Sequence, residues 1–140
     1  MRSGRATAHG NWVRWLKFNA VGAAGIFVQL AVLVSLRAGL HMHYLLATAL
    51  AVEATVLHNF FWHERFTWAD RKSTNWGARL LKFNLATGLF SIAGNLFFTA
   101  VLVRAGLGYL PANAVSIALC SLINFFLNDR LVFVPPERRN

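Results

Sequence analysis

Residues 58–68 read His-Asn-Phe-Phe-Trp-His-Glu-Arg-Phe-Thr-Trp, and residues 123–133 read Ile-Asn-Phe-Phe-Leu-Asn-Asp-Arg-Leu-Val-Phe. Both stretches place Asn-Phe-Phe before an acid, an Arg and a final aromatic residue, and they lie 65 positions apart. The same offset relates Leu-Lys-Phe-Asn at 16–19 to an identical run at 81–84. Because two separate motifs share one offset, the sequence predicts a tandem duplication with repeats 16–68 and 81–133.

The composition indicates a membrane protein. Of the 140 residues 56% are hydrophobic and only 14% are charged, and most charges lie outside four apolar runs. Each run is about the length that a helix needs to cross ~30 Å of hydrocarbon. We therefore predict an all-α membrane protein with four transmembrane helices, built as a tandem two-helix (2+2) repeat. The expected parts are a basic leader (1–15), a transmembrane domain (16–134) with spans near 16–36, 44–62, 79–103 and 109–127, and a tail (135–140).

The basic residues predict the orientation of the chain. Twelve of the 14 Lys and Arg residues lie in the leader, in the middle loop with its flank and in the tail, which leaves only Arg37 and Arg104 for the other side. By the positive-inside rule, both termini and the middle loop are cytoplasmic. This distribution and anionic lipid explain the net charge of +9 without a nucleic-acid partner. The single cysteine, Cys120, excludes an intrachain disulfide and a multi-Cys metal site, and we expect it to be a small buried hydrophobe.

Polar residues within the apolar runs are candidates for binding. Glu53 lies near the middle of the second run, where a carboxylate costs several kcal/mol unless it is paired, hydrated or protonated. It is interpreted as a proton-linked or head-group-binding acid; the alternative is a neutral Glu that joins two helices by hydrogen bonds. Asn59, Asn84 and Asn124 lie on polar stripes. They either bind a head group or pack helices together.

Two pairs of cations share the 65-residue offset at the span ends that we expect on the cytoplasmic side. These are Lys17 with Lys82, and Arg65 with Arg130. Arg binds a phosphate through a fork of donors and Lys binds it as a point charge. The alternative is that these residues control topology and form salt bridges with the acid that precedes each Arg. That alternative explains the charge but not why the positions recur in both halves.

The sequence has no recognisable catalytic constellation. It lacks a Gly-rich phosphate loop, a His-Glu-x-x-His pair and a Gly-x-Ser-x-Gly elbow, and its histidines have no spacing typical of a metal site. We therefore expect no enzyme activity, no catalytic residue, no metal and no cofactor.

The chain resembles the GtrA-like family of small four-span bacterial membrane proteins. The resemblance lies in Lys-Phe-Asn-Ala-Val-Gly at 17–22 and in the Asn-to-aromatic motifs at 59–68 and 124–133, and it covers roughly residues 14–134. Two features depart from the family pattern. The first motif ends Phe-Thr-Trp where Trp-Thr-Phe is commoner, and Gly22 faces Thr87 at the offset.

The resemblance implies that the protein flips a polyprenyl-phosphate-linked sugar from the inner to the outer leaflet of the bacterial cytoplasmic membrane. The sugar would serve cell-surface polysaccharide or glycolipid synthesis, and a membrane glycosyltransferase would be a partner. The candidate substrate-binding residues are Lys17, Glu53, Asn59, Arg65, Lys82, Asn84, Asn124 and Arg130.

Two other functions fit the residues. One is a non-transporting membrane anchor that recruits a glycosyltransferase. The other is a proton-coupled exporter of the small multidrug type, which has its acid in the first span rather than in the second. Four short helices enclose little volume, so a homo-oligomer is also expected for the carrier of the lipid-linked sugar.

Overall fold

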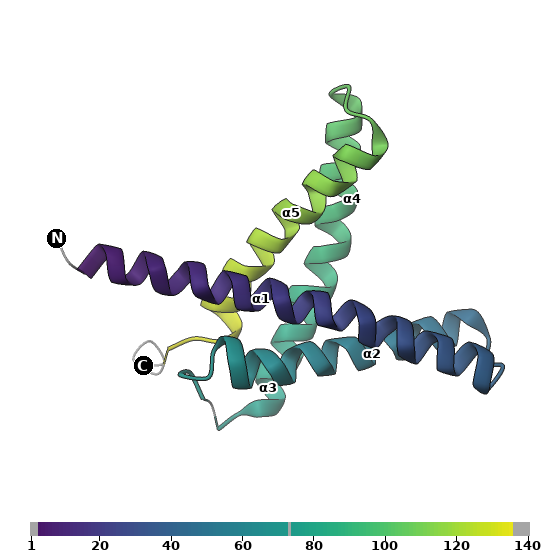
Figure 1. The fold of residues 1–140 in the computed structure, drawn as a ribbon, viewed down its shortest axis with the longest axis horizontal. Coiled ribbons are helices and arrows are strands. Elements are labelled where there is room, and N and C mark those ends of the chain that lie inside the picture. Colours follow the sequence, from purple (N-terminus) through teal and green to yellow (C-terminus); the bar gives the residue numbers. More distant parts are fainter. Residues whose placement is uncertain (1–2, 73, 136–140) are drawn as a thin grey trace. The chain divides into compact units, whose positions relative to one another are not determined.

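The computed structural model describes residues 3–72 and 74–135, and their side chains except those of 3–9, 44, 45 and 110 (Figure 1). The first two residues of the expected leader, and residues 136–140 of the expected tail, lie outside this range. Every regular element in the described part is helical. The elements are α1 (Ser3–Val34), η1 (Ser35–Gly39), α2 (Tyr44–Trp62), η2 (His63–Thr67), α3 (Trp76–Asn84), η3 (Leu85–Leu89), α4 (Phe90–Arg104), α5 (Tyr109–Leu127) and η4 (Asn128–Val132), where η marks a π-helical turn.

The chain divides into two compact units. The N-terminal unit lies within Met1–Asp70 and the C-terminal unit within Arg71–Asn140. In the N-terminal unit α1 and α2 pack side by side, and in the C-terminal unit α4 and α5 do the same (Figure 1). Each unit is therefore a helical hairpin.

Local chemistry sets where several helices begin and turn. The side chain of Asn75 accepts a hydrogen bond of 3.2 Å from the backbone N–H of Ala78, which caps α3. Pro111 lies in the first turn of α5, where its missing N–H costs no hydrogen bond. The turn between α4 and α5 contains Gly106 at φ 100°, which a residue without Cβ adopts readily.

The helices α2 and α5 end in the same way. Both continue into a π-helical turn, and the bounds of α2 and η2 correspond to those of α5 and η4 at the 65-residue offset. A backbone hydrogen bond of 2.8 Å closes each turn, from Trp68 to the His63 carbonyl and from Phe133 to the Asn128 carbonyl. π turns are rare and are frequent at functional sites. The repeated motif thus forms a repeated local structure.

The structure is that of a membrane protein. Three helical stretches of the described part are long and apolar enough to cross a bilayer: Gly10–Gly39, Trp76–Arg104 and Pro111–Val132. The second expected span forms α2, but it is not one of these three, and it carries Glu53. The count of four spans therefore stays a prediction. Helix α1 begins at Ser3, so the described part of the expected leader is already helical and forms the first turns of α1.

Burial in both hairpins follows the pattern of a protein in lipid. Large apolar side chains on α4 point outward, and Leu96 is 70% exposed. The contacts within the hairpins use small residues, with Ala47 and Ala51 buried on α2 and Ala112 and Ser116 buried on α5. Small side chains let helix backbones approach closely where no hydrophobic effect drives association. Cys120 is buried as well, which confirms its expected role as a small buried residue.

Gly25 on α1 lies directly against the side chain of Asn59 on α2. A Cβ at Gly25 would lie 2.9 Å from Asn59 Nδ2 and 3.0 Å from Asn59 Cγ, whereas a Cβ at Gly22 would meet nothing within 4 Å. We expect Gly25→Ala to destabilise the protein by ~1–3 kcal/mol, because the added methyl group overpacks the hairpin. Gly22→Ala, the matched control, should change stability by less than ~0.5 kcal/mol. Thermal unfolding in detergent, followed by tryptophan fluorescence, measures both. Equal stability of the two variants would contradict this packing.

Candidate functional site

In the N-terminal unit an aromatic cluster holds the π turn η2 against α1. The ring of Phe18 stacks on His63 at 4.8 Å between centroids, and Trp68 meets Phe18 edge-on at 6.0 Å. All three side chains are buried. His63 Nδ1 also lies 3.0 Å from the hydroxyl of Thr67. The cluster joins the end of α2 to the start of the expected first span.

The C-terminal unit has a matching cluster at η4. Phe83 meets Phe133 edge-on at 6.2 Å, so this pair occupies the positions of Phe18 and Trp68 at the 65-residue offset. Asn128 takes the place of His63 and is fully buried. Its amide donates to the hydroxyl of Thr87 at 3.1 Å and to the carbonyl of Asn124 at 2.8 Å. In this unit the Asn128 amide and the Thr87 hydroxyl thus stand where the N-terminal unit has the His63 imidazole, and Asn128 is still buried.

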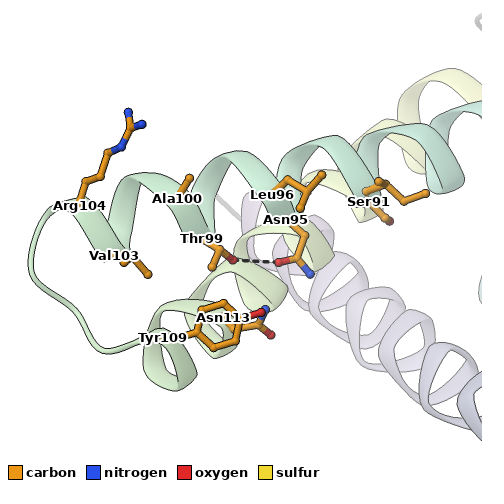
Figure 2. Close-up of a pocket in the computed structure, with 10 residues that line it drawn as sticks. Ser91, Asn95, Leu96, Thr99, Ala100, Val103, Arg104, Tyr109 and Asn113 are labelled. Atoms are coloured by element: carbon orange, nitrogen blue, oxygen red, sulfur yellow. Dashed lines mark hydrogen bonds between the residues drawn. The ribbon is translucent and has the colours of Figure 1, made fainter.

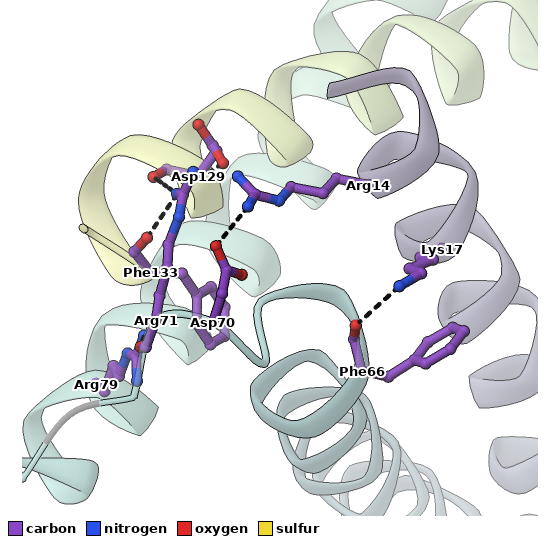
Figure 3. Close-up of polar contacts among 8 residues, drawn as sticks. All are labelled: Arg14, Lys17, Phe66, Asp70, Arg71, Arg79, Asp129 and Phe133. Carbon is purple, nitrogen blue, oxygen red and sulfur yellow. Dashed lines mark hydrogen bonds and ion pairs between the residues drawn. The ribbon is translucent and has the colours of Figure 1, made fainter. Parts of the chain in front are cut away.

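Two buried arginines of the C-terminal unit bind the carbonyls at the end of η4 (Figure 3). Arg71 donates to the carbonyls of Asp129 and Phe133 at 3.0 and 2.8 Å, and it forms an ion pair of 2.8 Å with the Asp129 carboxylate. Arg79 donates to the Val132 carbonyl at 3.2 Å and to the carbonyl of Arg71, and it lies over the Phe133 ring. These donors satisfy carbonyls that a helix end leaves free.

Sequence reasoning counted Arg71 and Arg79 only as topology-determining charges and missed this structural role. A signal was available, because Arg79 corresponds to Arg14 at the offset that relates the two motifs. Arg14 forms an ion pair of 2.5 Å with Asp70 within the N-terminal unit (Figure 3). The repeated position of an Arg thus pointed to a local partner in each unit.

Two of the candidate phosphate ligands of the N-terminal unit lie on aromatic rings. Lys17 Nζ is 4.6 Å from the centre of the Phe66 ring and 3.5 Å from the Phe66 carbonyl oxygen (Figure 3). The guanidinium of Arg65 lies 4.3 Å from the centre of the Phe61 ring and is exposed. A cation held over a ring keeps its outer side available to an anion.

The other two candidate cations, Lys82 and Arg130, are exposed in the C-terminal unit. Asp129 is paired with Arg71, so the acid beside Arg130 is already bound elsewhere. Arg130 lines a groove of about 480 Å³ whose other lining residues are apolar: Ile123, Phe126, Leu127 and Leu131. A cation at the edge of an apolar groove can bind an anionic head group whose tail stays on apolar surface.

The candidate asparagines lie in the interiors of the hairpins. Asn59 is half-buried against Gly25 of α1, with its Oδ1 3.1 Å from His58 Nδ1. Asn124 is buried and donates to the Ser91 hydroxyl at 2.5 Å. Asn84 is half-buried at the end of α3. Asn59 and Asn124 thus each contact the facing helix of their own hairpin, and their role in binding stays a prediction.

Glu53 lies on the exposed side of α2, beside Val52, which is 42% exposed. The role of Glu53 stays a prediction.

A second and larger groove lies between α4 and α5, and sequence reasoning did not single it out. It has a volume of about 760 Å³ and lies in the half of the hairpin nearer the connecting turn (Figure 2). Its lining combines polar and apolar residues: Ser91, Ile92, Asn95, Leu96, Thr99, Ala100, Val103, Arg104, Tyr109 and Asn113. The spacing of Ser91, Asn95 and Thr99 along one helix face was the signal that could have found it.

His63 makes stability depend on pH. It follows the expected end of the second span, and burial lowers its pKa from 6.5 to about 3, with a smaller effect from His58. At a pH between these two pKa values the imidazole is protonated in the unfolded chain but not in the folded chain. The free energy of unfolding therefore falls as pH falls below about 6.5. We expect a loss on the order of 2 kcal/mol by pH 5. Thermal unfolding between pH 7.5 and 5 measures it.

Two variants test this assignment. His63→Asn installs the residue found at position 128 and should remove this part of the pH dependence. His41→Asn is the control, because His41 is exposed and Asn tolerates its φ of 51°. If His63→Asn keeps the full pH dependence, the buried imidazole is not its source.

Comparison with known proteins shows a relationship over most of the chain. The model of the "GtrA/DPMS, transmembrane domain" family matches residues 17–104 and 85–140. A dolichol-phosphate mannosyltransferase of Pyrococcus furiosus is 35% identical over 120 residues, which cover 86% of this chain and 34% of that protein. The chain thus spans about a third of the length of that relative. With the matches to the family model, these findings show that the chain belongs to the GtrA/DPMS transmembrane domain family.

Proposed function

We propose that this protein moves a polyprenyl-phosphate-linked sugar from the inner to the outer leaflet of the bacterial cytoplasmic membrane, for cell-surface polysaccharide or glycolipid synthesis. The proposed substrate has an anionic phosphate, a polar sugar and a long apolar tail. Membership of the family and the membrane character of the chain support this class of ligand. The observation that carries the proposal is the environment of Arg130.

Arg130 offers what such a lipid requires at one place. The guanidinium is exposed, and the acid next to it in the sequence is bound by Arg71. The groove beside it is otherwise apolar. A guanidinium can bind a phosphate through two parallel hydrogen bonds. The prenyl chain would cover the apolar wall while the phosphate meets Arg130.

The other candidate residues complete the proposal. Lys17, Arg65 and Lys82 would recruit the phosphate at the span ends expected on the cytoplasmic side, and Asn59, Asn84, Asn124 and Glu53 would contact the head group. We infer four spans with both termini on the cytoplasmic side, from the distribution of Lys and Arg. We also infer a tandem repeat, which the matching bounds of α2 with α5 and of η2 with η4 support.

A second function has an observation in its favour. The relative is named a mannosyltransferase, and this chain matches only 34% of its length. The relative therefore contains a part that is similar to this chain, joined in one polypeptide to further sequence, and the whole protein carries the name of an enzyme. This arrangement favours a non-catalytic membrane partner of a glycosyltransferase. The proton-coupled exporter has no such observation in its support beyond Glu53.

The test is transport in proteoliposomes that contain a short-chain polyprenyl-phosphate hexose with a labelled head group. Wild-type protein should accelerate movement of the label between leaflets. Arg130→Ala should slow the initial rate by about 10- to 100-fold, because a charge-assisted hydrogen bond to phosphate contributes about 1.5–3 kcal/mol. Lys72→Ala is the matched control: it removes an exposed positive charge of the same unit outside the groove and should leave the rate unchanged.

The outcomes separate the candidate functions. If wild-type protein does not move the lipid, the carrier proposal is wrong. Co-purification of a glycosyltransferase from the native membrane would then favour the partner function. If Lys72→Ala slows transport as much as Arg130→Ala, the effect is a general one of charge and the assignment of Arg130 fails.

A further inference from the structure

We propose that the groove between α4 and α5 is a binding site for the neutral sugar of a lipid head group. This inference rests on the proposed function and deepens it, because it assigns the sugar and the phosphate to different places on the C-terminal unit.

The groove opens towards lipid. Its α4 wall includes Ile92, which is 67% exposed, and Leu96, which is 70% exposed. Both lie within the stretch Trp76–Arg104, which is apolar and long enough to span a bilayer. If this stretch spans the bilayer, the wall of the groove would face lipid, and an entering molecule would carry an apolar part.

The groove also contains amide groups with unused hydrogen-bonding capacity. Figure 2 shows Asn95 and Thr99 directed from α4 towards α5, where Asn113 and Tyr109 lie. The contact of Asn95 is made by Oδ1, which lies near the Thr99 hydroxyl and leaves Nδ2 available. The side chain of Asn113 makes no hydrogen bond among the residues that the structure describes, and the residue is half-buried. Unsatisfied amides in a low-dielectric setting favour a ligand that carries hydroxyl groups.

The chemistry of these groups fits a neutral head. Asparagine amides and a tyrosine hydroxyl both donate and accept, as sugar hydroxyls do. The ring of Tyr109 adds an apolar face beside its hydroxyl. Arg104 is the one charged lining residue found for this groove, and its side chain points away from α5 in Figure 2. The groove therefore lacks the converging cations that a phosphate site uses.

The position of the groove separates it from Arg130. Arg130 lies 17 residues after Asn113 along α5 and η4, a distance of about 26 Å at 1.5 Å per residue. One head group cannot contact both places at once. The two grooves would therefore hold the same lipid in succession, the phosphate at Arg130 before crossing and the sugar between α4 and α5 after it.

The N-terminal unit does not carry the same polar set. At the 65-residue offset Val34 stands in place of Thr99 and Ala51 in place of Ser116. The hydrogen bond of 3.0 Å between Thr99 and Ser116, which lies behind the groove, therefore has no equivalent there. Thr48, which corresponds to Asn113, supplies a matched control position on the exposed side of α2.

The test compares lipid retention by native mass spectrometry of the full chain in nanodiscs. The probes are a short-chain polyprenyl-phosphate hexose and the same polyprenyl phosphate without sugar. Wild type should prefer the hexose lipid. Asn95→Leu/Asn113→Leu should reduce that preference about 30-fold, since two hydrogen bonds of about 1 kcal/mol each are lost, and should leave retention of the sugar-free lipid intact. Thr48→Leu should retain the wild-type preference.

Asn113→Leu alone is a second variant, because the amide it removes supports no described contact and the fold should tolerate its loss. It should also lower the preference. If wild type retains both lipids equally, or if both groove variants keep the wild-type preference, this inference is wrong although the carrier function can stand. If wild type retains neither lipid, both this inference and the proposed carrier function are wrong.

Discussion

The structure depends on an aromatic contact that closes each hairpin. Phe18 meets Trp68 in one unit and Phe83 meets Phe133 in the other, both edge-on with centroids 6.0 and 6.2 Å apart. Each contact fixes a π-helical turn, whose backbone hydrogen bond precedes the aromatic side chain that packs against α1 in one unit and against α3 in the other. The turn also leaves carbonyls that need donors, and in the C-terminal unit Arg71 and Arg79 supply them. Arg71 and Arg79, which the sequence presents only as positive charges, thus help to hold the end of η4 in place.

Lipid as the solvent explains how the remaining residues are used. Large apolar side chains point outward, and small residues such as Ala51 and Ser116 form the contacts between helices. Polar side chains then have two possible roles. Asn124 donates to Ser91 on the facing helix, whereas the side chain of Asn113 makes no hydrogen bond in the described part of the chain and lines an open groove. Residue type alone does not indicate which of these amides already has a partner within the hairpin.

Much of the candidate site could be predicted from spacing. The 65-residue offset identified Arg130 and Lys82 before their exposure was known. It did not show that Asp129 pairs with Arg71 rather than with the adjacent Arg130, because an ion pair across 58 positions depends on how η4 meets the loop before α3. The groove between α4 and α5 was missed for a related reason. Its polar residues come from α4 and α5, and only the tertiary structure shows that these residues lie close together.

The sequence by itself determined the membrane class, the helical hairpins and the recurring motif at their ends, because apolar length and residue spacing are properties of the chain. It also pointed to the family, which the matches confirmed. The tertiary structure decided which charges are buried, which amides are used and where grooves open. Burial and hydrogen bonding depend on neighbours distant in the sequence: Arg71 meets Phe133, and Asn59 meets Gly25. No periodicity within one helix specifies such partners, since only the packing of the hairpin brings them together.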